Sequence, residues 1–171
     1  ATLSIPIDLP PGPNQLQPDL ALSYSSLRGD GLLGVGWSLG LSKIACSARI
    51  GVPDYSSCEN YELDGEIIVG PDAQGAFHTF EESFDRIDSS GPSGSDRPCR
   101  VNSKNGIETF FGLAATSRVS GPGGIAEWHI DRIEDVFGNR VDFEYTPGPV
   151  GDRGELRPRR ITYAQAHREI L

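Results

Sequence analysis

Methionine is missing from this chain of 171 residues, and cysteine, histidine and tryptophan are scarce. The three cysteines and three histidines are scattered without a Cys-x-x-Cys spacing, so the sequence predicts no structural metal site. No run approaches the roughly 18 apolar residues of a membrane-spanning helix, and no basic-then-apolar start predicts a signal peptide. Because an initiator methionine is also lacking, we expect a piece of a longer polypeptide or a processed product.

Basic residues are in the minority as well. The chain has 15 Lys and Arg against 24 Asp and Glu, which gives a formal net charge of -9. Binding to nucleic acid depends on clustered Lys and Arg that neutralise phosphates, so this composition argues against a nucleic-acid partner and permits a basic protein surface as partner. A length of 171 residues corresponds to one domain with a sizeable core.

The first 44 residues carry the clearest pattern. Apolar and polar residues alternate over residues 3–9 and 20–24, and a proline-rich connection lies at residues 10–13. Alternation with period two predicts two strands, and hence a hairpin with a long, stiff connection. Pro6 removes a hydrogen-bond donor from the first strand, which favours a place at the edge of a sheet. A glycine-rich apolar segment follows at residues 31–41.

After residue 44, short extended segments alternate with turn signals, and helical periodicity is nearly absent. Asp64-Gly65 and Asn105-Gly106 are strong signals for tight hairpin turns. Residues 89–98 and 120–124 are rich in Gly, Ser and Pro and are predicted to be surface loops. This alternation of short strands and turns is typical of an antiparallel all-β protein.

The last third of the chain, residues 128–163, has a pattern of its own. A turn-forming stretch at residues 135–139 precedes the alternating Val141, Phe143 and Tyr145, and similar elements recur at residues 154–163. Together with a tryptophan ahead of the turn, these residues resemble one repeat of the rearrangement hot spot (RHS) and YD-repeat proteins. The resemblance implies stacked hairpins in a long, spiralling sheet that encloses a cavity.

The amino-terminal segment carries a second resemblance. Residues 5–7, 9–12, 20–24 and 31–39 resemble the opening of the SpvB family, which comprises the amino-terminal part of the Salmonella virulence plasmid B protein and of the B subunits of insecticidal toxin complexes. The resemblance implies an all-β fold whose antiparallel hairpins form an extended, curved sheet of the RHS or toxin-shell type. It also implies a single SpvB-type domain over residues 1–171, with its signature at residues 3–44 and the YD-like unit at residues 128–163.

From this resemblance we expect a non-enzymatic structural module of a secreted, extracellular bacterial toxin or RHS-like protein. The module would contribute to a shell that encapsulates, translocates or presents a toxic domain, and it would need no cofactor. Its partners would be the remainder of the same polypeptide or toxin-complex subunits. One family member carries a separate carboxy-terminal ADP-ribosyltransferase domain, but the Glu-x-Glu pair of such domains does not occur in this sequence, so we expect no catalytic residues here.

The alternative is a secreted or surface recognition module that binds a carbohydrate or a host protein. Its candidate contact residues are Trp37, Trp128 and the tripeptide Arg28-Gly29-Asp30, which spells a cell-adhesion motif and is equally explained by turn chemistry. Exposed tryptophans around a concave patch would favour recognition. Tryptophans buried in a sheet would favour the scaffold.

Two further features stay open in the sequence. Cys46 and Cys58 are a candidate disulfide if the compartment is oxidising, and the alternative is three idle thiols, with Cys99 the third.

Several acidic residues gather around the predicted turn at residues 135–139, and alternation would send them to opposite faces, which favours a solvated surface over a calcium site. They are Asp131, Glu134, Asp135 and Asp142.

Overall fold

The computed structural model describes residues 1–27, 29, 33–47, 60–81, 83–88, 98–121, 124–147, 156–164 and 168–170. Nearly all of its regular elements are strands, with two short 3-10 turns between them. In chain order the elements are β1 (Thr2–Pro6), η1 (Pro13–Gln15), β2 (Ala21–Ser25), β3 (Trp37–Leu39), β4 (Lys43–Cys46), β5 (Tyr61–Leu63), β6 (Glu66–Val69), β7 (His78–Thr79), β8 (Arg86–Ile87), β9 (Cys99–Asn102), β10 (Glu108–Phe111), η2 (Ala115–Ser117), β11 (Arg118–Gly121), β12 (Gly124–Glu134), β13 (Arg140–Pro147), β14 (Leu156–Tyr163) and β15 (Arg168–Ile170).

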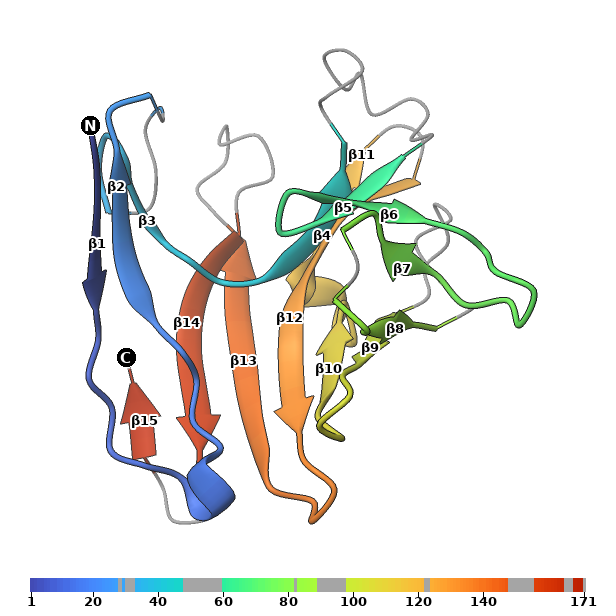
Figure 1. The fold of residues 1–171 in the computed structure, drawn as a ribbon. Helices are drawn as coiled ribbons and strands as arrows, with labels where there is room; N and C mark the ends of the chain where they lie inside the picture. Colours follow the sequence, from blue (N-terminus) through green and yellow to red (C-terminus); the bar gives the residue numbers. More distant parts are fainter. Residues whose placement is uncertain are drawn as a thin grey trace.

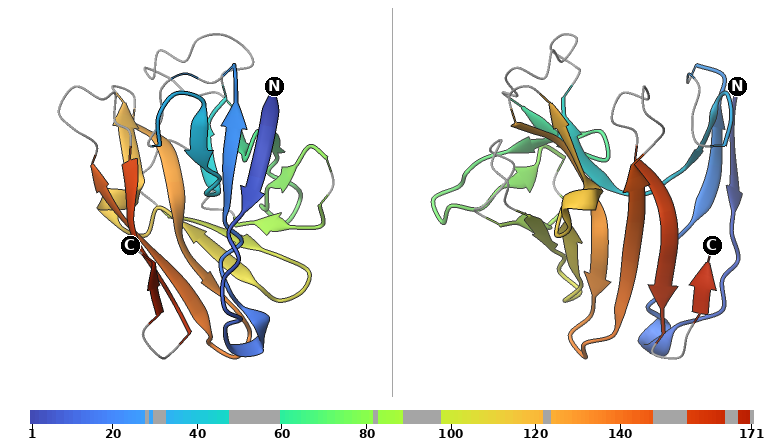
Figure 2. Two further views of the ribbon diagram at one scale, coloured as in Figure 1. Left: turned by 90° about the vertical axis from the view of Figure 1, so that its left-hand side faces the viewer. Right: turned by 180° about the vertical axis from the view of Figure 1, so that it is seen from behind.

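The strands form two antiparallel sheets (Figure 1). β1, β2 and β3 make a three-stranded sheet in that order, and the other strands make a 12-stranded sheet. The small sheet stands opposite the β13–β14 part of the large one, as Figures 1 and 2 show. The prediction of an antiparallel all-β fold is therefore confirmed, and so is the edge position of the first strand, which ends at Pro6.

β12 organises the large sheet, because two different strands pair with each of its edges. Along one edge, residues 127–129 pair with β4 and residues 132–134 pair with β13. Along the other edge, β11 pairs with the first part of β12 and β10 with the last part. The large sheet therefore forks on one side of β12, with β4 leading to one branch and β13 to the other (Figure 1).

The branch that begins at β4 returns to β12 and closes a small barrel. It runs through β5, β6 and β7, while β10, β9 and β8 leave β12 from its opposite edge. Among the described residues, one isolated bridge joins the two ends: Phe77 and Ile87 exchange backbone hydrogen bonds of 2.9 and 2.8 Å. The other branch, β13 to β15, is open and forms the tall wall of the molecule (Figure 1).

The hydrophobic core is centred on Trp128 of β12, which has no exposed surface. Its ring meets Tyr61 edge-on, with 5.5 Å between ring centroids. Gly112 has a φ of +69°, in the left-handed region, and lies so close that a Cβ at this position would come within 2.3 Å of the indole. Ile44 and Phe111 are also fully buried in this cluster. Burial of a large aromatic residue among neighbours without voids is a principal source of stability.

A buried tyrosine secures the fork of the large sheet. Ile130 of β12 donates its N–H to the Ser42 carbonyl at 3.1 Å, just ahead of β4. The Ile130 carbonyl accepts the hydroxyl of Tyr145 from β13 at 2.7 Å, so the two branches meet at one residue. Burial, together with the negative charge of nearby Asp131, raises the pKa of Tyr145 and keeps the hydroxyl protonated as a donor.

The predicted hairpin turns are confirmed, and one predicted loop is shorter than expected. Asp64 and Gly65 both have positive φ and join β5 to β6, as a tight primed turn requires. Gly106, also with positive φ, lies in the turn between β9 and β10. The loop predicted at residues 120–124 is shorter than expected, because Gly121 of β11 pairs with Gly124 of β12; residues 122 and 123 lie outside the described residues. Most of the other predicted loop, residues 89–98, lies outside the described residues.

Replacing Tyr145 by Phe tests the closure of the fork. The change keeps the ring and removes the hydroxyl, which leaves the Ile130 carbonyl without its side-chain donor, so we expect a loss of about 1–3 kcal/mol in the free energy of unfolding. Urea denaturation followed by tryptophan fluorescence measures it. Tyr24→Phe is the matched control, since that ring packs on Trp37 at the surface of the small sheet, and we expect a change below about 0.5 kcal/mol. Equal effects of the two variants would contradict the role given to Tyr145.

Candidate interaction surface

The small sheet has one apolar face and one face of small polar residues. Register places Leu3, Tyr24 and Trp37 in one row across the three strands. A second row on the same face contains Ile5, Leu22 and Leu39. Alternation sends the serines between these positions to the opposite face, where they form a row of their own. They are Ser4, Ser23 and Ser38.

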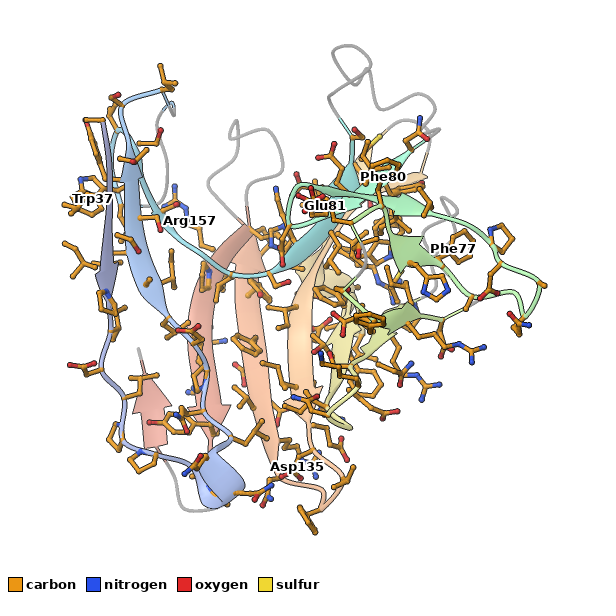
Figure 3. The ribbon with its side chains drawn as sticks, viewed as in Figure 1. Trp37, Phe77, Phe80, Glu81, Asp135 and Arg157 are labelled. Atoms are coloured by element: carbon orange, nitrogen blue, oxygen red, sulfur yellow. The ribbon has the colours of Figure 1, made fainter. Side chains whose placement is uncertain are left out.

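The apolar face is only partly covered. Leu3 and Ile5 of β1 are 53% and 43% exposed. Trp37 is half-buried, and its ring lies 5.3 Å from that of Tyr24. In Figure 3 Trp37 lies on the side of the small sheet that faces away from β13 and β14. Leu39 of this face packs against the core, whereas Leu3, Ile5 and Trp37 leave apolar area uncovered, and this marks the face as a candidate interaction surface, which we call the outer face.

Two contacts from the connection between β1 and β2 fasten the small sheet to the wall. The Tyr163 hydroxyl of β14 donates to the Pro10 carbonyl at 3.0 Å. Asn14 of η1 donates from its side-chain amide to the Asp135 carboxylate at 3.1 Å. Leu16 and Leu20, near the end of this connection, are buried in the core. The small sheet is therefore fixed in place at its lower end.

Asp135 also shapes the turn between β12 and β13, at the bottom of Figure 3. One carboxylate oxygen accepts the backbone N–H groups of Phe137 and Asn139, both at 2.9 Å. The other accepts the Asn139 side chain at 2.8 Å, and Gly138 takes the positive φ that the turn needs. These hydrogen bonds, that from the Asn139 side chain first, hold the pKa of Asp135 below its usual range. The predicted turn at residues 135–139 is confirmed.

The same turn presents two apolar side chains to solvent. Val136 and Phe137 are 70% and 75% exposed. Val136 lies against the turn between β9 and β10, since a Cβ on Gly106 would come within 2.7 Å of it. Two further exposed aromatic residues, Phe80 and Phe84, lie on the barrel side of the molecule. Apolar surface at the tip of a fixed turn adds a second candidate contact region.

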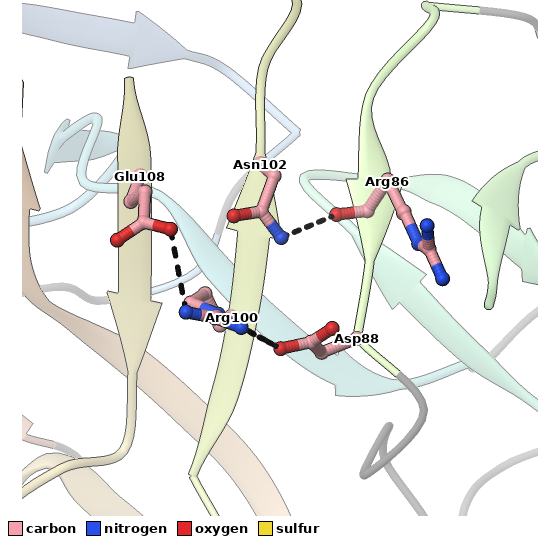
Figure 4. Close-up of polar contacts among 5 residues, drawn as sticks. All are labelled: Arg86, Asp88, Arg100, Asn102 and Glu108. Atoms are coloured by element: carbon pink, nitrogen blue, oxygen red, sulfur yellow. Dashed lines mark hydrogen bonds and ion pairs between the residues drawn. The ribbon is translucent and has the colours of Figure 1, made fainter. Parts of the chain in front are cut away.

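Charged residues on the barrel form pairs that are structural. Arg100 of β9 bridges Asp88 at 2.5 Å and Glu108 of β10 at 3.3 Å (Figure 4). The hydrogen bond to Asp88 raises the pKa of Arg100 further. Asn102 donates to the Arg86 carbonyl at 3.5 Å on the neighbouring strand. The guanidinium is partly exposed, and such pairs contribute little to stability but fix which strands neighbour each other.

A more buried charged cluster crosses the junction of β4 and β12. Glu127 accepts Lys43 Nζ at 2.9 Å and lies 2.9 Å from His129 Nε2. Burial alone would raise the pKa of Glu127, but the His129 hydrogen bond and the charge of Lys43 outweigh it and lower the pKa to about 2. The ring of His129 lies 5.5 Å from that of Tyr145. No sequence signal marks this cluster, because the pairing of β4 with β12 brings together residues that are 84 positions apart.

The two tryptophans predicted to make recognition contacts differ in their exposure. Trp128 is fully buried, so its ring is not available to a partner, while Trp37 is half-buried on the outer face. Gly29 is exposed, and Arg28 and Asp30 lie outside the described residues. The burial of Trp128 therefore supports the scaffold interpretation, whereas the position of Trp37 leaves recognition open.

The predicted acidic group is split among separate partners. Asp131 is buried and accepts the Ser117 hydroxyl at 2.7 Å; burial raises its pKa. Asp142 pairs with Arg132 at 2.8 Å. Within the described ranges, no group of three or more His, Cys, Asp or Glu side chains is placed to hold a metal ion. In the same part of the chain, no helix is long and apolar enough to cross a membrane.

The cysteines differ from one another. Cys99 is a free thiol in the core, and burial raises its pKa to about 12, so it carries almost no reactive thiolate. Cys46, the last residue of β4, is disulfide-bonded. Cys58 lies outside the described residues, so its pairing with Cys46 stays a prediction.

Comparison with known proteins finds relatives in sequence. Residues 1–76 match the SpvB family, described as the Salmonella virulence plasmid 65kDa B protein. Mono(ADP-ribosyl)transferase SpvB from Salmonella choleraesuis (strain SC-B67) and from Salmonella typhimurium are each 30% identical to the chain over 173 residues. The alignments cover 84% of this chain and 29% of each relative, so the chain spans less than a third of the curated relatives that it matches.

Solved structures share the fold. The N-terminal domain of effector protein SpvB from Salmonella typhimurium strain LT2 matches with a TM-score of 0.70 and 24% identity, over 88% of this chain and 60% of that chain. A chain of the TcdB2-TccC3-Cdc42 crystal structure matches with a TM-score of 0.79 and 20% identity, over 95% of this chain and 9% of that chain. The Photorhabdus luminescens Tc holotoxin pore gives a TM-score of 0.77 at 20% identity, with the same coverage. These likenesses confirm the expected SpvB and toxin-shell type of fold.

The charged cluster predicts a specific dependence of stability on pH. Because the pKa of Glu127 is lowered in the folded state, its contribution is fully present above the ordinary value near 4.5 and is lost as pH falls towards about 2. We expect Glu127→Gln to lower the free energy of unfolding by on the order of 2 kcal/mol at pH 7. Below pH 4.5 the difference in stability between this variant and the parent should shrink. Urea denaturation at several pH values measures this. Glu144→Gln, at a half-exposed ion pair, is the control, and a gap that does not change with pH would contradict the role given to Glu127.

The disulfide prediction is tested by mass spectrometry. Digestion without reductant should yield a peptide in which Cys46 is linked to Cys58, while Cys99 should be alkylated only after unfolding. Reduction should lower the free energy of unfolding by about 2–3 kcal/mol, because the closed loop is short. A free Cys58 in the native protein would show that the pairing is wrong.

Proposed function

The chain carries an SpvB-family segment over residues 1–76 and the fold of the SpvB amino-terminal domain, and on this basis we propose that it is a non-enzymatic structural module of a secreted bacterial toxin. In this proposal the module forms part of a shell that encapsulates, translocates or presents a toxic domain. Its partners are the remainder of the same polypeptide or other toxin-complex subunits.

The single observation that carries this proposal is the forked sheet around β12. A closed barrel on one branch anchors the module, and the open wall of β13, β14 and β15 on the other branch offers strands for continued pairing. Backbone hydrogen bonds along such a wall do not depend on side-chain identity, so hairpin after hairpin can extend it. The match to 9% of a chain from the TcdB2-TccC3-Cdc42 structure, over nearly all of this chain, supports a place within a larger toxin particle.

The transferase name of the curated relatives is not carried over to this chain. The alignments cover 29% of those relatives, and the Glu-x-Glu pair expected of an ADP-ribosyltransferase domain is absent from the sequence. The partly buried charged cluster of Glu127, His129 and Lys43 joins two strands and has the partners of a structural ion pair. Both observations support a structural role for this module within the toxin.

A second candidate, recognition of a host protein or a carbohydrate, is favoured by one observation. Trp37 lies on the outer face, where it is only half-buried. Aromatic side chains in such positions are frequent at protein interfaces, because they combine a large apolar area with a polar group. The substitution Trp37→Phe distinguishes the two functions, because it removes the indole N–H and keeps an apolar ring. If the indole makes the contact, binding of the host ligand is lost in this variant. If the module is part of a shell, assembly of the shell is retained.

The shell proposal is tested in the intact natural polypeptide or complex that contains this chain. Trp128→Ala removes the centre of the core and should lower the free energy of unfolding by about 3–5 kcal/mol. The loosened module would then no longer close its part of the shell. We expect limited trypsin digestion to release and degrade the enclosed toxic domain several times faster than in the parent. The rate of loss of that domain, followed by gel electrophoresis, is the measurement.

Ser120→Ala is the matched control, because this exposed position lies near the barrel rim and its change should leave digestion unaffected. Hydrogen exchange of the β10 and β12 amides, measured by mass spectrometry, verifies that Trp128→Ala has loosened the module. If the module is loosened and the toxic domain is digested at the parental rate, the shell proposal is wrong.

A further inference from the structure

The free edge of the small sheet has a defined hydrogen-bonding pattern. β1 lies at the end of its sheet, as Figure 2 shows, and pairs only with β2 among the described strands. Ile7 donates to the Leu20 carbonyl at 2.8 Å, and Ser26 donates to the Ala1 carbonyl at 3.0 Å. In an antiparallel pair every second residue points its backbone groups at the partner strand. Residues 1, 3, 5 and 7 therefore point towards β2, and residues 2, 4 and 6 point outward.

The outward groups form a complete edge for one more strand. Thr2 and Ser4 each offer an N–H and a carbonyl, and Pro6 offers a carbonyl. Pro6 has no N–H, but this missing donor falls on the outward side, so the β1–β2 ladder loses nothing. The proline ends the edge after two donors and so limits an added strand to about five residues.

The side chains of β1 also suit the addition of one more strand. Leu3 and Ile5 are the outermost members of the two apolar rows, and their large exposed fractions result from the lack of a next strand among the described residues. No residue of β1 is charged, although free edges in soluble proteins usually carry charges that repel added strands. The edge therefore lacks the usual protection apart from its terminal proline.

We infer that the outward edge of β1 is a strand-addition site for an extended segment of a toxin-complex polypeptide, with apolar residues opposite Leu3 and Ile5 and small polar residues opposite Thr2 and Ser4. The inference rests on the proposed function for the identity of that polypeptide, but the pairing chemistry comes from β1 itself. The added strand continues the two rows of the outer face and covers the half-exposed leucine and isoleucine. Main-chain bonds supply the affinity, and the alternating side chains supply the selectivity.

A tethered strand is the probe for this site. Ala1→Gly is combined with an amino-terminal extension of sequence Thr-Val-Thr-Val-Thr-Asn, so that Asn and Gly form a two-residue hairpin turn. This register places the valines opposite Leu3 and Ile5 and the threonines opposite Thr2 and Ser4. We expect hydrogen exchange at the Thr2 and Ser4 amides, measured by NMR, to slow at least about 10-fold relative to the parent.

The control extension, Pro-Val-Pro-Val-Pro-Asn, keeps both valines and the carbonyls that face Thr2 and Ser4 but removes the N–H donors that face β1, so the added ladder loses those hydrogen bonds and should protect far less. Ser4→Pro is the matched change in the chain: it deletes an outward N–H and should abolish protection at Thr2 while the melting temperature of the parent fold stays nearly constant. Ile5→Pro deletes an inward N–H and should destabilise the β1–β2 ladder. Equal exchange of Thr2 and Ser4 with both extensions would overturn the inference.

Two further outcomes distinguish a toxin-complex strand from a second copy of the chain. If the parent chain already protects Thr2 and Ser4 in a concentration-dependent way, and sedimentation shows a dimer, the occupant is a second copy and the inference is wrong. In the intact natural polypeptide or complex, Ser4→Pro should raise protease access to the toxic domain without unfolding the module. Parental protease resistance of Ser4→Pro, with Trp128→Ala still sensitive, would overturn the strand-addition site and leave the shell proposal standing.

Discussion

The pairing of β12 with four strands is the constraint on which the structure depends. A strand has two edges, and here each edge is divided between two partners, so one continuous segment of 11 residues belongs to a closed barrel and an open wall at once. Its residues serve both parts: Trp128 fills the core, while the Ile130 backbone bonds to Ser42 on the β4 side and to Tyr145 of β13. A shift of β12 by one residue would turn Trp128 to the opposite face and separate these partners.

Much of this fold could be predicted from local chemistry. Glycine at positive φ marks the hairpin turns at Gly65, Gly106 and Gly138, and alternation identified most strands. The edge position of the first strand followed from one proline. Long-range pairing was beyond such reasoning, because nothing in the residues of β4 says that β12 is its neighbour. The Glu127 cluster, the isolated bridge at Phe77 and the place of Trp128 in the core all follow from that pairing.

The candidate surface could be predicted only in part for a related reason. Sequence patterns located the apolar rows of the small sheet, but they could not tell which face would turn outward. In globular proteins the apolar face normally turns to the core, whereas here the connection held by Asn14 and Tyr163 fixes the small sheet with Trp37 outside. This partial exception to ordinary burial is what marks the outer face as a candidate interaction surface.

The isolated bridge that closes the barrel has a consequence for local opening. Between β13 and β14, seven residue pairs share the pairing, whereas at the seam Phe77 and Ile87 contribute one bridge of two backbone hydrogen bonds, beside the contact of His78 Nδ1 with the Asp85 carbonyl at 3.3 Å. With a net contribution of about 1 kcal/mol per bond, we expect the bridge to open at a lower free-energy cost than the pairing of β13 with β14. Local opening of this bridge would therefore loosen the barrel while the backbone pairing of β13 with β14 stays intact.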